Sequence, residues 1–143
     1  MKGKSTEALA ALLRDLQADC AAYGRLRELL EAQFQAALRH QAEPLQRLAD
    51  EIVMLVDELD AHTRVRGLLL RKLLGSQCDA SMSRLLSRLP PAAAQALGDI
   101  WATLEGQVRE CKALNQRNCQ LITEQQALMR RVMGVEEGLY AES

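Results

Sequence analysis

Apolar residues recur in steps of three and four along most of this 143-residue chain, and no other feature limits its fold as strongly. In the first part of the chain the apolar positions are Leu9, Leu12, Leu13, Leu16, Cys20, Tyr23, Leu26, Leu30, Phe34 and Ala37. Steps of three and four place side chains on one face of an α-helix. Only 3% of the residues are aromatic, and strand-favouring residue types are scarce. We therefore expect an all-α protein.

Prolines and glycines divide this pattern into four helices. Pro44 suits the first turn of a helix, where its missing N–H is no loss, and Gly75 suits the position just after a last turn. Pro90-Pro91 mark the start of the last helix. No proline or other strong helix breaker follows until Gly134, so we expect this helix to end there. The expected helices cover residues 5–39, 44–74, 81–88 and 91–134 of a single domain, residues 1–143.

The helix lengths predict an arrangement. At 1.5 Å per residue, a last helix of about 40 residues reaches roughly 60 Å, whereas the first two reach only about 45 Å. We expect an antiparallel bundle of three long helices with a short connecting helix. The C-terminal part of the last helix should project from this bundle.

Charge and hydropathy exclude several classes of protein. Lys+Arg number 18 and Asp+Glu 19, with no basic arm, so nucleic acid is not an expected partner. No apolar stretch approaches the roughly 20 residues that cross a bilayer, so we expect no membrane insertion. Arg14 and Asp15 interrupt the only stretch that resembles a signal peptide, which predicts a cytoplasmic protein.

Residues that carry catalysis or hold metals are sparse. The two histidines, His40 and His62, lie on different predicted elements, and the chain has no glycine-rich phosphate loop. His62 falls on the apolar stripe of the second helix and is expected to be a core residue with a satisfied ring. Asp57 to Asp60 is typical of a solvated face. We expect no enzyme, no cofactor and no metal site.

The second half of the last helix mixes amides with apolar residues. Asn115 and Asn118 share a face, and Gln125 follows one heptad after Asn118. A buried amide without a partner costs about 1 to 3 kcal/mol. One interpretation is therefore a surface that becomes buried only when a partner supplies hydrogen bonds. The other is a core amide that sets the register between helices.

One segment of the chain is distinctive. Residues 111–122 read CKALNQRNCQLI, and they are followed by QQAL at 125–128, by Gly134 and by Leu139-Tyr140. This segment resembles the C-terminal signature of the FlgN-type flagellar export chaperones. The arginines of residues 64–69 and the early Trp101 also match that family's layout.

The resemblance implies a cytoplasmic chaperone that is monomeric when free. Such a protein binds the C-terminal helical segment of hook-associated junction proteins of the FlgK and FlgL type. It thereby prevents premature assembly, and it delivers them to the flagellar type III export gate. The partner-contact positions implied by the resemblance are Asn115, Asn118, Leu121, Ile122, Gln125, Leu128, Met129, Val132 and Tyr140.

Two alternatives remain open from the residues. A helical coiled-coil scaffold could self-associate through the projecting half of the last helix, with Asn118 and Gln125 setting register across a dimer. A chaperone of another type III secretion substrate would have the same sequence features.

Overall fold

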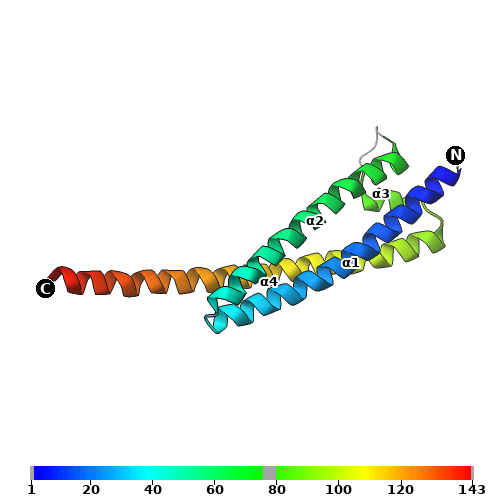
Figure 1. Ribbon diagram of the computed structural model, residues 1–143. Coiled ribbons are helices and arrows are strands. Elements are labelled where there is room, and N and C mark those ends of the chain that lie inside the picture. The colour runs from blue at the N-terminus through cyan, green and yellow to red at the C-terminus, as the bar shows by residue number, and fades with distance from the viewer. Residues whose placement is uncertain (1, 76–79, 143) are drawn as a thin grey trace.

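The computed structural model describes the backbone of residues 2–75 and 80–142, and the side chains of residues 6–75, 80–135 and 138. Its helices, in chain order, are α1 (Lys2–Leu38), α2 (Ala42–Leu74), α3 (Met82–Ser87) and α4 (Pro91–Glu142) (Figure 1). No described residue lies in a strand. The prediction of an all-α protein is confirmed.

A tight turn joins α1 to α2. The Gln41 N–H donates to the Ala36 carbonyl at 3.0 Å, and the His40 N–H donates to the Ala37 carbonyl at 3.2 Å. This pair of bonds is a Schellman motif, which needs a left-handed residue at its centre. His40 takes that conformation, with φ 54°. The turn therefore satisfies the last carbonyls of α1 and reverses the chain.

Prolines and glycines act at α2 and α3 largely as predicted. Pro44 lies in the first turn of α2, although the helix begins two residues earlier than expected. Gly75 follows the last turn with φ 88°, and its N–H donates to the Arg71 carbonyl at 2.8 Å. Ser81 caps α3, because its side chain accepts a hydrogen bond from the Arg84 N–H at 3.2 Å.

The last helix is longer than predicted. It runs to Glu142, so the expected end at Gly134 is wrong. A glycine inside a helix costs about 1 kcal/mol relative to alanine, but unlike proline it removes no backbone hydrogen bond. The helix therefore continues through Gly134 to the residues on its C-terminal side. At 1.5 Å per residue, the 52 residues of α4 span about 78 Å.

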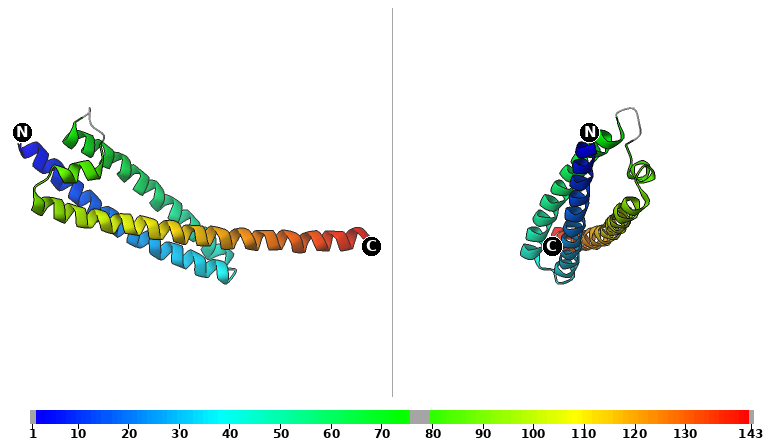
Figure 2. Two further views of the ribbon diagram at one scale, coloured as in Figure 1. Left: turned by 180° about the vertical axis from the view of Figure 1, so that it is seen from behind. Right: turned by 90° about the vertical axis from the view of Figure 1, so that its right-hand side faces the viewer.

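The long helices are arranged around α1. In Figures 1 and 2, α2 runs back along α1, and α4 runs in the same direction as α1. No described Cα of α2 lies within 8 Å of one in α4. The expectation of an antiparallel bundle of three long helices is therefore only partly right. Bulky groups separate α2 from α4: the Arg66 guanidinium lies 5.7 Å from the centre of the Trp101 ring.

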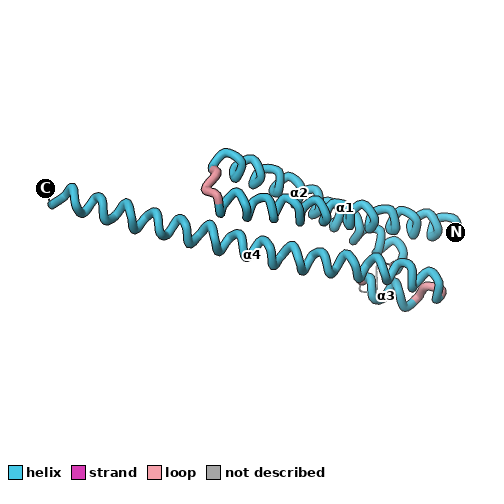
Figure 3. Tube along the Cα trace, turned by 90° about the horizontal axis from the view of Figure 1, so that it is seen from below, coloured by secondary structure: helices cyan, strands magenta, loops and turns pink. Residues whose placement is uncertain are grey.

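The core lies along α1. Its largest cluster joins α1, α2, α3 and the start of α4 through Leu12, Leu16, Leu70, Leu74, Met82, Leu85, Leu97 and Leu104. A second cluster around Leu30 includes Leu59 of α2 and Cys111 of α4. The third, near the turn, contains residues of α1 and α2 only. Beyond the turn, α4 continues without a neighbouring helix, as seen from below in Figure 3.

Candidate partner-binding site

The side of α4 that packs on α1 becomes uncovered where α1 ends. Among the described residues, the last hydrogen bond across this pair runs from Gln125 Nε2 to the carbonyl of Ala37 at 2.9 Å, one residue before the end of α1. From Gln126 to Val135 every residue is exposed. The same face continues past this point, because Val132 follows Gln125 by seven residues, about two helical turns.

This uncovered face carries an unusual set of apolar side chains for a solvent-exposed helix. Met129 is 61% exposed and Val132 is 47% exposed, with three further large apolar residues around them. We call this set the projecting stripe: Leu128, Met129, Val132, Met133 and Val135. Leu38, at the end of α1, is also exposed. Contiguous apolar surface of this kind marks an interaction site more often than isolated exposed residues do.

The structure distributes the predicted contact residues over three environments. Leu128, Met129 and Val132 are exposed on the projecting stripe. Leu121, Ile122 and Gln125 are half-buried where α4 leaves α1, and Asn115 is exposed. Asn118 is buried. The side chain of Tyr140 lies outside the described residues.

Asn118 belongs to the core of the helix pair. It is 0% exposed, and its Nδ2 donates to the Leu30 carbonyl at 2.7 Å and to Gln33 Oε1 at 2.8 Å. Its Oδ1 accepts from Arg117 Nε at 3.2 Å. The interpretation that this amide becomes buried only when a partner binds is therefore wrong. The alternative, a core amide that sets the register between two helices, describes Asn118 correctly.

Arg117 extends this contact to a second polar group and an aromatic ring. Its guanidinium lies 3.7 Å from the centre of the Phe34 ring, and its Nη1 is 3.3 Å from a Glu31 oxygen. These contacts hold α4 against α1 about three helical turns before the projecting stripe. Sequence reasoning missed Arg117 because a charged residue beside a stripe is usually solvated. The only available signal for Arg117 was its position next to Asn118.

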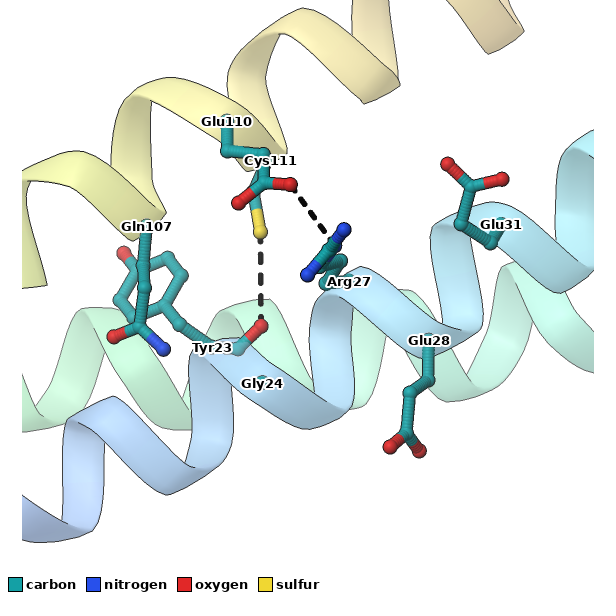
Figure 4. Close-up of a pocket in the computed structure, with 8 residues that line it drawn as sticks. All are labelled: Tyr23, Gly24, Arg27, Glu28, Glu31, Gln107, Glu110 and Cys111. Carbon is teal, nitrogen blue, oxygen red and sulfur yellow. Dashed lines mark hydrogen bonds and ion pairs between the residues drawn. The ribbon is translucent and has the colours of Figure 1, made fainter.

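A polar cavity of about 620 Å³ lies between α1 and α4, upstream of the stripe (Figure 4). Arg27 and Glu110 form an ion pair of 2.9 Å across it, and the Cys111 thiol donates to the Tyr23 carbonyl at 3.7 Å. Burial raises the pKa of the Cys111 thiol, and the neighbouring Glu110 raises it further. A protonated, hydrogen-bonded thiol is a poor nucleophile, so this cavity offers no reactive cysteine.

The most buried charged cluster joins α1 to α2. Arg66 Nη1 donates to Asp19 Oδ2 at 2.6 Å and to Asp15 Oδ2 at 3.0 Å, and His62 Nδ1 lies 2.7 Å from Asp19 Oδ1. Ligand atoms of Asp15, Asp19 and His62 lie within 4.8 Å of one another, a spacing that could suit a metal ion. The guanidinium already contacts both carboxylates, however, and supplies the positive charge that a metal would bring. This cluster is a buried ion network that ties α1 to α2. His62 has a hydrogen-bond partner, as expected, but its side chain is 35% exposed, so it lies at the edge of the helix pair and not in the core.

The arrangement therefore offers one exposed apolar helix face anchored on a rigid helix pair. Such a face can receive the apolar side of another helix. Among the described residues, no helix has a segment both long and apolar enough to cross a bilayer.

Comparison with known proteins supports one family. Residues 1–135 match the family described as FlgN protein. No curated protein and no solved structure matches the chain. The match covers both the helix pair and the whole projecting stripe, so the chain belongs to the FlgN family, a family of flagellar export chaperones.

Proposed function

We propose that this chain binds the C-terminal helical segment of hook-associated proteins of the FlgK and FlgL type in the cytoplasm. Binding covers the surface that these proteins use for assembly, and it prevents their premature association. The chain then delivers them to the flagellar type III export gate. Family membership supports hook-associated proteins as the class of partner.

The observation that carries this proposal is the projecting stripe. Up to Gln125 the apolar face of α4 is covered by α1, and beyond it the same face is exposed. A partner helix that lies in line with α1 would cover Met129 and Val132 in the way that α1 covers the preceding turns. It would also bury Leu38, which is 47% exposed at the end of α1. Apolar burial of this kind contributes roughly 25 cal/mol per Å².

The proposal is tested with the full chain and a tagged C-terminal fragment of a FlgK-type protein from the same organism. The wild-type chain should co-purify with the fragment. Met129→Ser combined with Val132→Ser should raise the Kd roughly tenfold or more, because both side chains lose apolar contact with the partner helix. Calorimetry or fluorescence anisotropy measures this change.

Two controls separate this site from general effects. Ala127→Ser changes a residue on the opposite side of α4, and Met54→Ser removes a methionine of similar exposure from α2. Both should leave the Kd for the fragment unchanged. Equal weakening by Met54→Ser and Met129→Ser, or wild-type binding by the double variant, would place the partner elsewhere.

A self-associating scaffold makes the opposite prediction for the same stripe. In that case the free chain would form a dimer that Met129→Ser and Val132→Ser abolish, and it would be indifferent to FlgK-type fragments. A chaperone of another type III secretion substrate would need the stripe but would not bind these fragments.

A further inference from the structure

Charged residues follow one side of α4 at intervals of seven residues, and their charges alternate. We call this set the charge ladder: Glu110, Arg117, Glu124 and Arg131. Seven residues make about two helical turns, so these side chains lie on the same side of the helix. Each one directly precedes a residue of the face that α1 covers or of its continuation: Cys111, Asn118, Gln125 and Val132. The charge ladder therefore flanks that face from the covered part of α4 to the projecting stripe.

The first two members of the charge ladder are paired with α1. Arg27 Nε lies 2.9 Å from Glu110 Oε1 (Figure 4), and Arg117 Nη1 lies 3.3 Å from Glu31 Oε1. Arg27 and Glu31 are about one helical turn apart on α1, so the charges of α1 alternate along this edge as those of α4 do. Ion pairs at the edge of an apolar seam set partner and orientation in paired helices.

The last two members lie where α1 ends and beyond it. Glu124 directly precedes Gln125, whose hydrogen bond to Ala37 is next to the end of α1. The Glu124 carboxylate accepts a hydrogen bond of 3.2 Å from Gln120 within α4, and it forms no ion pair with another described residue. Arg131 is exposed and likewise has no ion-pair partner among the described side chains. The pattern that α1 completes as far as Arg117 is therefore open from Glu124 onward.

The other edge of the same face is different. The residues that directly follow the face positions are Lys112, Cys119, Gln126 and Met133, so this edge has no charged side chain after Lys112. A helix that lies on the projecting stripe consequently meets charges along one edge only. This asymmetry determines which edge of an amphipathic helix can face the charge ladder.

We propose that the helix bound to the projecting stripe continues the charge pattern of α1, with a basic side chain beside Glu124 and an acidic side chain beside Arg131. The inference rests on the proposed function and adds a rule of partner selection to it. Apolar contacts with the stripe hold the partner, whereas the two ion pairs select which amphipathic helices bind and in which register. A helix with these two charges exchanged meets like charges and is rejected.

The first test exchanges the two open charges in the full chain. Glu124→Arg combined with Arg131→Glu leaves the net charge unchanged, so long-range attraction to the partner is preserved. The Kd for the tagged FlgK-type fragment should rise roughly tenfold or more, because two attractions become two repulsions. The difference from the wild type should shrink at raised salt, since both positions are exposed. Circular dichroism should show an intact fold, as for other changes at exposed positions.

A matched pair of single variants locates the effect on one side of α4. Arg130 and Arg131 are neighbours and both are exposed, but Arg130 lies on the side of the helix away from the projecting stripe. Arg130→Glu and Arg131→Glu change the net charge equally. Arg131→Glu should raise the Kd at least about threefold more than Arg130→Glu does, as expected for a reversed ion pair at an exposed edge.

Compensating changes in the fragment identify the partner charges. Basic residues of the fragment are reversed to Glu and acidic residues to Lys, one of each at a time, at positions that border its apolar face. One such pair should bring the Kd of the exchanged chain back to within about threefold of the wild-type value, and the same pair should weaken binding to the wild-type chain. The order of the two residues along the fragment then gives the direction of the bound helix.

The outcomes separate this inference from the proposed function. Equal Kd values for Arg130→Glu and Arg131→Glu would overturn the inference, as would an exchanged chain that binds like the wild type or that no fragment pair restores. If Met129→Ser with Val132→Ser still weakens binding in those cases, the proposed function stands without the charge rule. A wild-type chain that does not bind the fragment would overturn both.

Discussion

Asn118 shows how one polar side chain can serve a fold without serving a partner. Its amide hydrogen bonds to the Leu30 carbonyl and to Gln33 specify one axial position of α4 on α1. A sliding of one helix by a single turn would leave a buried amide unpaired, at a cost of about 1 to 3 kcal/mol. The residue therefore determines where the covered part of α4 ends and the projecting stripe begins.

Asn118→Leu should consequently destabilise the free chain. The substitution keeps the volume of the side chain but removes its hydrogen bonds to α1, and we expect the free energy of unfolding to fall by about 1 to 3 kcal/mol. Urea denaturation followed by circular dichroism measures it. Asn115→Leu is the matched control, because Asn115 is exposed three residues earlier on the same helix. A variant at position 118 as stable as this control would show that the amide has no role in packing.

The ion network between α1 and α2 predicts a pH dependence of stability. Burial raises the pKa of the Asp15 carboxyl, and Asp19 raises it further, while Arg66 and His62 oppose the shift. Between the ordinary value of about 4 and this raised value, the folded chain binds more protons at Asp15 than the unfolded chain does. The contribution of Asp15 to stability is therefore present at low pH and is lost as the pH rises through the raised pKa.

Asp15→Asn removes this titration while keeping the shape of the side chain. The difference in free energy of unfolding between variant and wild type should move in favour of the variant as the pH rises from 3 to 7. Chemical denaturation at a series of pH values measures the difference. A change in the opposite direction would mean that the ion pair with Arg66 outweighs the burial of the carboxylate.

At the scale of whole elements, α4 combines a supported half with an unsupported one. The first half packs on α1 through residues such as Leu104, which is 2% exposed. The second half depends on local helix propensity alone, since no described side chain from Gln126 to Val135 is buried. Gly134 lies in this second half, and a Cβ added there would meet no atom within 4 Å.

Gly134→Ala should therefore stabilise the projecting part of α4 without affecting the core. Alanine is favoured over glycine inside a helix by up to about 1 kcal/mol. Hydrogen exchange should show slower opening of the amides around residue 134, with unchanged protection in the covered part of α4. Faster exchange in the variant would show that this segment is not helical in solution.

The elements were easier to predict than their contacts, for a physical reason. Pro44 and Gly75 change the local backbone, so helix ends at these residues could be read from the sequence. Gly134 weakens a helix without breaking it, and its position alone could not show whether α4 stops. The exposure of Leu128, Met129 and Val132 followed from the unequal lengths of the helices. Asn118 lies on the same helix face as these residues. It is buried and they are exposed because α1 ends between them, and the sequence alone does not show where α1 ends relative to α4.

The whole molecule keeps its stability and its candidate interaction surface on separate segments. The core clusters lie along α1, whereas the projecting stripe extends beyond the turn. This separation allows a partner to bind or leave without repacking the core. A chaperone of the kind proposed would benefit from such an arrangement, because release of the partner would not require the core to refold.

Truncation tests this separation directly. A chain that ends at Gln126 keeps the hydrogen bond from Gln125 to Ala37 and every buried residue of the described core. Its free energy of unfolding should stay within about 0.5 kcal/mol of the full chain, as for changes at exposed positions, while capture of a FlgK-type fragment should be lost. Thermal denaturation and co-purification of the same two proteins measure both effects. Retained capture would place the binding surface on the helix pair, and a large loss of stability would show that the projecting segment folds back on it in solution.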